Sequence, residues 1–159
     1  MLFRDIDTKI AVIGLGYVGL PLAVEFAHRT SCLLTNEKLE RSVIAFDVNE
    51  VRLDELRAGY DRTNEVNKEL LGNLNSLHFT SDPTDLHLAD VFIITVPTPI
   101  DKFKKPDLNP LFNASKMIGK VIKKGDLIVY ESTVYPGCIE EQCVPLLEQY
   151  SNLKFNKDF

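Results

Sequence analysis

The stretch that determines the expected fold is Lys9-Ile-Ala-Val-Ile-Gly-Leu-Gly-Tyr-Val-Gly-Leu-Pro-Leu-Ala23. It begins with a short apolar run that does not alternate with polar residues, as expected of a strand buried on both faces of a sheet. The run ends in the pattern G-x-G-x-x-G at Gly14–Gly19, and apolar residues then recur at helical spacing from Leu20 to Ala27. Pro21 falls in the first helical turn, where its missing N–H costs nothing. We therefore predict a buried strand, a tight glycine turn and a helix.

A glycine turn between a strand and a helix is suited to binding a diphosphate. Gly14 permits the tight turn, Gly16 lets the backbone approach a pyrophosphate, and Gly19 lets the helix pack against the strand. The N–H groups at the helix start, near Tyr17 and Val18, would face the phosphates at the positive end of the helix dipole. The glycine pattern alone is a weak signal, and the flanking strand and helix supply the context that it needs. The alternative is a tight turn that binds no ligand.

Strands and helices alternate along the rest of the chain. Further strands are predicted at Val43–Asp47, Leu77–Thr80, Asp90–Val96, Leu127–Glu131 and, as a sixth, Leu153–Phe155. Helices are predicted at Glu50–Ala58 with Asn49 as N-cap, within Glu65–Leu74, and from Pro110 to Ile122 with Asn109 as N-cap. A last helix is predicted from Ile139 to Tyr150, with a bend at Pro145. The sequence thus predicts an α/β fold, a doubly wound parallel sheet of Rossmann type, as a single domain over residues 1–159.

Ligands of such sheets bind at the carboxyl ends of the strands, where the strand order reverses. Right-handed crossovers bring all these ends to one edge. We therefore expect four segments to converge there: Gly14–Gly19, Asp47–Arg52, Val96–Pro99 and Glu131–Gly137.

Asp47 ends the second predicted strand, where a carboxylate can accept hydrogen bonds from the adenosine ribose and would repel a 2′-phosphate. This favours NAD over NADP, and the alternative role is a helix cap. Asp47 lies further from the glycine turn than the roughly 20 positions that are usual, which we attribute to a polar surface loop inserted at residues 30–42. Arg52, in the first turn of the next helix, either lies over the adenosine or is solvated.

Composition and charge exclude several classes of protein. The 159 residues are 45% hydrophobic and 26% charged, enough for one folded domain, and a net charge of −5 disfavours binding to nucleic acid or to an anionic membrane. No apolar run approaches the ~20 residues that span a bilayer, and the N-terminus does not read as a secretory signal. Cys32, Cys138 and Cys143, an odd number, favour free thiols in the cytoplasm, and with three scattered histidines they make a metal site improbable.

The ordered set of motifs resembles the UDP-glucose/GDP-mannose dehydrogenase family. The matching segments are Gly14–Ala23, Ile44–Asn49, Gly59-Tyr-Asp-Arg-Thr-Asn-Glu-Val66, Val96-Pro-Thr-Pro99 and Glu131-Ser-Thr-Val-Tyr-Pro-Gly137. The last two are most similar to the branch that acts on UDP-N-acetylhexosamines and makes uronic acids for capsule and O-antigen polysaccharides. The resemblance implies backbone contacts of Tyr17 and Val18 with the pyrophosphate of NAD, a ribose contact of Asp47, and Arg52 as a basic residue beside it.

The resemblance also implies that Thr98 and Thr133 contact NAD near the nicotinamide, with Thr133 close to the catalytic centre. Family members are much longer, and their nucleophilic cysteine and catalytic lysine lie beyond Phe159. Cys138 and Cys143 lie in the wrong segment to be that nucleophile and are interpreted as small core residues. We therefore expect an N-terminal cofactor domain, inactive alone, of an enzyme that oxidises C6 of a UDP-N-acetylhexosamine or UDP-glucose to the acid with two NAD, as a homodimer.

Two other functions share the predicted fold. One is a regulatory nucleotide-sensing domain, such as those that gate potassium transport, and the other is the cofactor domain of a different NAD-dependent dehydrogenase, such as a hydroxyacid enzyme. The threonine-bearing loops after the fourth and fifth strands have no role in the first, and the Pro-Thr-Pro and Glu-Ser-Thr segments disfavour the second.

Overall fold

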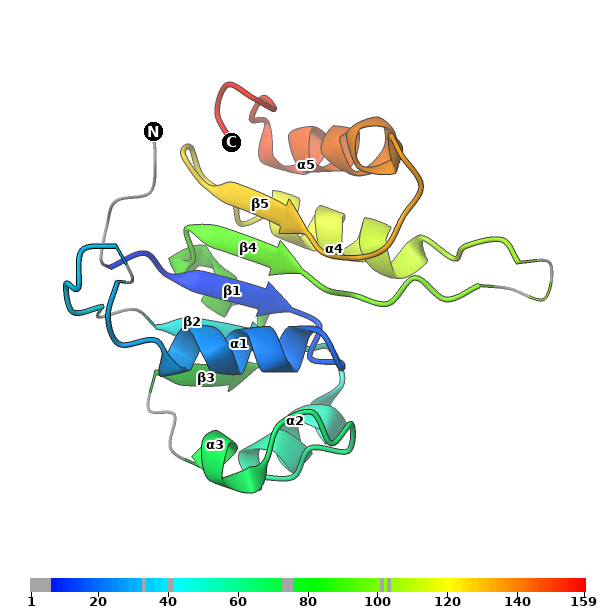
Figure 1. Ribbon diagram of the computed structural model, residues 1–159. Helices are drawn as coiled ribbons and strands as arrows, with labels where there is room; N and C mark the ends of the chain where they lie inside the picture. The colour runs from blue at the N-terminus through cyan, green and yellow to red at the C-terminus, as the bar shows by residue number, and fades with distance from the viewer. Residues whose placement is uncertain (1–6, 33, 40–41, 73–75, 101, 103) are drawn as a thin grey trace.

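The computed structural model of the chain describes residues 7–32, 34–39, 42–72, 76–100, 102 and 104–159. Five parallel strands form its sheet, in the order β3-β2-β1-β4-β5 (Figure 1). They are β1 (Ile10–Ile13), β2 (Val43–Phe46), β3 (Leu77–Thr80), β4 (Val91–Ile94) and β5 (Leu127–Tyr130). The order reverses between β1 and β4, which confirms the predicted doubly wound sheet and locates its switch point.

Helices cover both faces of the sheet. One face carries α1 (Gly19–His28), α2 (Glu50–Arg57) and α3 (Lys68–Gly72), and the other carries α4 (Asn109–Gly119), α5 (Val144–Ser151), the 3-10 helix η1 (Pro83–Leu88) and the π-helical turn η2 (Ile139–Cys143). Ile10 and Val12 enter the core under α1, whereas Ala11 and Ile13 enter the core under α4 and α5. All four are buried, which is why β1 shows no polar alternation.

Local signals located the start of α2 but neither end of α4. Asn49 caps α2 as predicted, because its side chain accepts a hydrogen bond from the backbone N–H of Arg52. The predicted cap of α4 is wrong by one position, since Asn109 is the first helical residue and its N–H donates to Oδ1 of Asp107 at 2.9 Å. The helix also ends at Gly119 and not at Ile122.

The remaining helix predictions hold in part. Within the predicted Glu65–Leu74 segment, α3 covers Lys68–Gly72, and residues 73 and 74 lie outside the described residues. The bend expected at Pro145 corresponds to the change from the π-helical turn to α5 at Val144. Segment 30–42 was interpreted as an insertion; its described residues form a loop with an antiparallel bridge between Ser31 and Lys38.

The predicted sixth strand at Leu153–Phe155 is wrong. Asn152 ends α5 in the left-handed conformation, with φ of 59°, and the chain then turns back on itself. The N–H of Lys154 donates to Oδ2 of Asp158, and the carbonyl of Asp158 accepts from the N–H of Gly125. The backbone of this segment is therefore bonded within the turn and to the loop before β5, and it pairs with no strand among the described residues.

Candidate cofactor site

A cavity of about 710 Å³ opens at the carboxyl ends of the strands. All four segments predicted to meet there contribute to its wall, which confirms their convergence. The contributions are Gly14–Val18 after β1, Asp47–Asn49 and Arg52 after β2, Val96–Thr98 after β4, and Glu131–Thr133 after β5. Four segments far apart in the sequence therefore line one cavity at the switch point.

The glycine turn has the shape that close approach of a ligand requires. Gly14 has φ of 96°, which favours glycine, and a Cβ on Gly19 would lie 1.9 Å from the Gly14 carbonyl oxygen. A Cβ on Gly16 would meet nothing within 4 Å, so this glycine faces open space. In the described chain, the backbone N–H groups of Gly16, Tyr17 and Val18 donate to no protein acceptor. Free donors therefore stand at the start of α1, beside the cavity.

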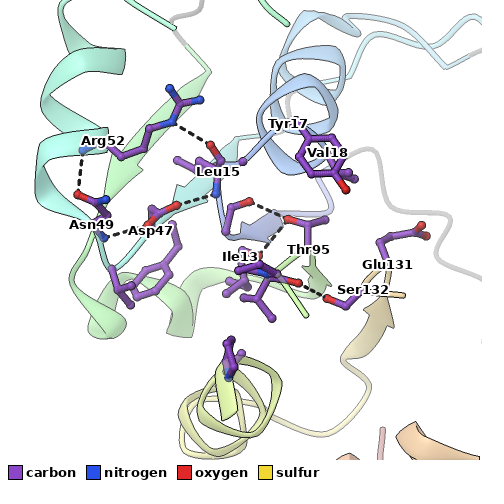
Figure 2. A pocket seen from close by; sticks show the side chains of 18 of the residues that line it. Ile13, Leu15, Tyr17, Val18, Asp47, Asn49, Arg52, Thr95, Glu131 and Ser132 are labelled. Atoms are coloured by element: carbon purple, nitrogen blue, oxygen red, sulfur yellow. Dashed lines mark hydrogen bonds between the residues drawn. The ribbon is translucent and has the colours of Figure 1, made fainter. Parts of the chain in front are cut away.

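Asp47, the first residue after β2, is hydrogen-bonded to this turn. Its Oδ2 accepts a hydrogen bond of 2.7 Å from the N–H of Leu15, and its Oδ1 accepts one of 2.9 Å from the N–H of Asn49 (Figure 2). The carboxylate lies in the cavity wall and is half-buried. Since Asn49 is the N-cap of α2, the alternative role of Asp47 as that cap is not what the structure shows.

The main contacts of Arg52 are with other residues of the protein, Leu15 and Asp61. The residue is only 4% exposed, so the solvated interpretation is wrong. Its Nε donates to the carbonyl of Leu15 at 3.0 Å, and its Nη2 donates to Oδ1 of Asp61 at 2.7 Å. A buried carboxylate draws the guanidinium inward, because an unpaired charge there would be costly. Arg52 still lines the cavity beside Asp47, so its contact with the adenosine remains a prediction.

Asp61 anchors the loop that follows α2. Burial raises the pKa of this carboxyl, but hydrogen bonds from Thr63 and Arg52 and from backbone N–H groups outweigh it and hold the pKa well below its usual range. The backbone donors include the N–H groups of Thr63, Glu65 and Val66. Asp61 is therefore a permanently charged acceptor near neutral pH. It lies in a segment that carried the family resemblance, but no role was predicted for it.

The two threonine-bearing loops are tied to each other. The hydroxyl of Thr98 donates to the carbonyl of Thr133 at 2.9 Å, and the hydroxyl of Ser132 donates to the carbonyl of Val96 at 2.7 Å. Both threonines line the cavity, and the Thr133 hydroxyl bonds to none of the described residues. The loops after β4 and β5 thus form one wall of the cavity, and the Thr133 hydroxyl in this wall is available to bind a ligand. Their predicted contacts with the nicotinamide remain predictions.

Sequence reasoning missed several residues at this site. The Thr95 hydroxyl donates to the carbonyls of Ile13 and Gly14 (Figure 2). The same hydroxyl lies where a Cβ on Gly19 would clash with it. The sequence signal that could have identified Thr95 is a hydroxyl residue at the end of an apolar strand. Further missed residues line the cavity from the loop after α2 and from α4; among them are Arg62, Thr63, Asn113 and Met117.

The cysteines have the environments expected of free thiols. Cys138 and Cys143 are fully buried in the core beside α4 and α5, which confirms their interpretation as core residues. Burial raises the pKa of Cys143. Among the described residues, no cluster of histidine, cysteine and carboxylate side chains could hold a metal ion, and no helix is long and apolar enough to cross a membrane.

Comparison with known proteins identifies the family. The model of the UDP-glucose/GDP-mannose dehydrogenase family, NAD binding domain, matches residues 8–159. The chain belongs to this family. The matched region is the family's NAD binding domain, so the cofactor of this site is NAD.

Individual relatives agree with this assignment. The chain is 55% identical over 153 residues to UDP-N-acetyl-D-glucosamine 6-dehydrogenase of Pseudomonas aeruginosa and 54% identical to protein CapL of Staphylococcus aureus, covering 96% of this chain and 34% and 33% of those proteins. A solved UDP-D-ManNAc dehydrogenase of Pyrococcus horikoshii matches with a TM-score of 0.82 and 32% identity, covering 96% of this chain and 34% of that one. The chain thus spans about a third of the length of these relatives.

The residues of the cavity fit NAD. The space beside Gly16 is free for a diphosphate, and the N–H groups of Gly16, Tyr17 and Val18 are free to donate to it. Asp47 stands in the wall after β2, where the ribose of a dinucleotide lies in this fold. Thr98 and Thr133 line the wall after β4 and β5, on the opposite side of the switch point from Asp47.

Proposed function

We propose that this chain is the NAD-binding domain, over residues 1–159, of a nucleotide-sugar 6-dehydrogenase. The whole enzyme would oxidise the C6 hydroxyl of a UDP-N-acetylhexosamine to the carboxylate, releasing two hydrides to two NAD and consuming one water. The observation that carries the proposal is the cavity at the switch point, which joins a glycine turn with free N–H groups to the carboxylate of Asp47. The names of the relatives support the reaction and the sugar.

The residues of this chain would bind and orient the cofactor. The N–H groups near Tyr17 and Val18 would hold the pyrophosphate, and Asp47 would accept hydrogen bonds from the adenosine ribose. The wall formed by Thr98 and Thr133 would fix the nicotinamide end. Bound NAD supplies hydride acceptance, which no side chain provides. Without the groups that attack the sugar, this domain alone would bind NAD and release no product.

The names of the relatives support the proposed substrate class and setting. UDP-N-acetyl-D-glucosamine 6-dehydrogenases are 55% and 50% identical to this chain, whereas UDP-N-acetyl-D-mannosamine dehydrogenases are 34–37% identical. The similarity to protein CapL supports a role in bacterial capsule polysaccharide synthesis. We expect the whole enzyme to be a cytoplasmic homodimer. Family membership favours this function over a nucleotide-sensing regulatory domain or a hydroxyacid dehydrogenase.

Calorimetry and a turnover assay test the two parts of the proposal. The chain should release or absorb heat on titration with NAD, and much less with NADP, because Asp47 repels a 2′-phosphate. The whole enzyme should produce two NADH for each UDP-N-acetylglucosamine consumed, and the chain alone should produce none. No heat at millimolar NAD would contradict the cofactor role. One NADH for each sugar would contradict oxidation to the acid.

A further inference from the structure

The buried pair of Arg52 and Asp61 lies beside the glycine turn but contacts only its Leu15 carbonyl. Two guanidinium nitrogens of Arg52 are used, Nε on Leu15 and Nη2 on Asp61, while Nη1 is buried and has no hydrogen-bond partner among the described residues. An unsatisfied buried donor costs free energy, and buried ion pairs are often no more stabilising than apolar residues of similar volume. Stability of the loop does not by itself explain why Arg52 reaches the glycine turn, and this contact indicates a further role.

The Leu15 residue is held on both sides. Asp47 accepts from its N–H, and Arg52 donates to its C=O, so its backbone has little freedom to rotate (Figure 2). In a trans peptide the C=O of one residue and the N–H of the next point in opposite directions. The structure contains no cis peptide bonds in its described part. Fixing the Leu15 carbonyl toward Arg52 therefore directs the N–H of Gly16 to the other side, away from Arg52.

Asp61 determines where Arg52 points. Its carboxylate is 1% exposed and binds the guanidinium as well as the loop of residues 63–66. A guanidinium has a planar fork of donors, so two acceptors on two of its nitrogens fix the plane of the group. Without Asp61, one side chain contact, to Leu15, would be left to orient Arg52.

We propose that Asp61 is a positioning residue for diphosphate binding, acting through Arg52 and the Leu15 carbonyl to aim the Gly16 N–H at the ligand. The inference rests on the proposed cofactor site and deepens it. It assigns a function in cofactor binding to a residue that lies outside the cavity wall. Asp61 itself would touch neither the diphosphate nor the ribose.

The test compares ligands with and without a diphosphate. NAD, ADP and adenosine are titrated into the chain and into D61N, with amide NMR signals as the readout. We expect D61N to bind NAD and ADP about tenfold more weakly, within the range of a charge-assisted hydrogen bond, and to bind adenosine as the unchanged chain does. D54N is the matched control, since Asp54 also pairs with an arginine of α2, Arg57, but is exposed. It should leave all three affinities unchanged.

A second variant keeps the proposal testable if D61N folds poorly. R52K retains the charge that Asp61 needs, but one ammonium cannot reproduce the planar fork that binds Leu15 and Asp61. It should lose more affinity for ADP than for adenosine, because a lost contact of Arg52 with the adenosine would weaken both ligands equally, whereas a misdirected Gly16 N–H would weaken only ADP. Equal losses for ADP and adenosine in both variants would indicate a merely structural role and overturn the proposal, as would unchanged ADP affinity.

The ligand-free spectrum separates this proposal from the proposed function. The Gly16 amide signal should shift in D61N and R52K and stay in place in D54N. A Gly16 signal that does not move refutes the positioning role, whatever NAD does. Failure of the unchanged chain to bind NAD, with a Gly16 signal that moves in D61N, would contradict the proposed function alone.

Discussion

Replacing Gly16 with alanine should abolish cofactor binding without harming the fold. A Cβ at this position meets no protein atom within 4 Å, and the backbone φ of Gly16 is not in the left-handed region. Alanine is therefore accommodated, and stability should stay within about 1 kcal/mol of the unchanged chain. The same methyl group would occupy the space through which a diphosphate approaches the turn.

The expected loss follows from the hydrogen bonds that would be displaced. Hydrogen bonds to a charged group contribute about 1.5–3 kcal/mol each, so losing even one or two lowers affinity by roughly 100-fold. Calorimetric titration with NAD measures this loss, and thermal unfolding checks the fold. We expect G16A to show no measurable heat at NAD concentrations that saturate the unchanged chain.

G72A is the matched control for this prediction. A Cβ on Gly72 also meets nothing within 4 Å, but Gly72 ends α3 and does not line the cavity. This variant should bind NAD as the unchanged chain does. If G16A binds NAD as tightly as G72A does, the diphosphate does not occupy the open space beside Gly16, and the predicted contact is refuted.

Three further predictions use other contacts. G19A should destabilise the fold by about 1–3 kcal/mol in urea unfolding, because its Cβ would lie 1.9 Å from the Gly14 carbonyl; unchanged stability would contradict this. Folding lowers the pKa of Asp61, so its ionised carboxylate stabilises the fold fully above the unfolded-state pKa of about 3.9, and this stabilisation is lost as pH falls below that pKa. The free energy of unfolding should therefore change less between pH 7 and pH 3 in D61N than in the unchanged chain. The pKa of Cys32 is lowered, chiefly by a hydrogen bond from Thr35, so Cys32 should react with a thiol reagent before the buried Cys143. Mass spectrometry of the labelled peptides gives the order of reaction, and earlier labelling of Cys143 would contradict the prediction.

Local sequence patterns predicted the sheet and the outline of the site. Strands buried on both faces appear as continuous apolar runs. The three glycines of the turn occur at a fixed spacing, because a side chain is disfavoured at each position for a different steric reason. Asp47 was found because it directly follows a strand, and parallel topology brings every such position to one edge. These features depend on residues close in sequence or on a general rule of topology.

The predictions failed where a contact depends on how separate segments pack. The sixth strand was wrong because Leu153–Phe155 is apolar enough for a strand, but its backbone bonds within a turn and to Gly125. The solvated interpretation of Arg52 was wrong because no local pattern shows which carboxylate a long side chain will reach.

The glycine turn illustrates the division between the two kinds of information. Its residue types can be read from the sequence, because glycine adopts the positive φ at Gly14 without strain and a side chain at Gly19 would clash. Its conformation is held by the Thr95 hydroxyl, the Asp47 carboxylate and the Arg52 guanidinium; Thr95 directly follows β4, Asp47 directly follows β2, and Arg52 lies in α2. Hydrogen bonds of this kind need distances near 3 Å between groups remote in sequence, and only the packed sheet with its helices sets those distances.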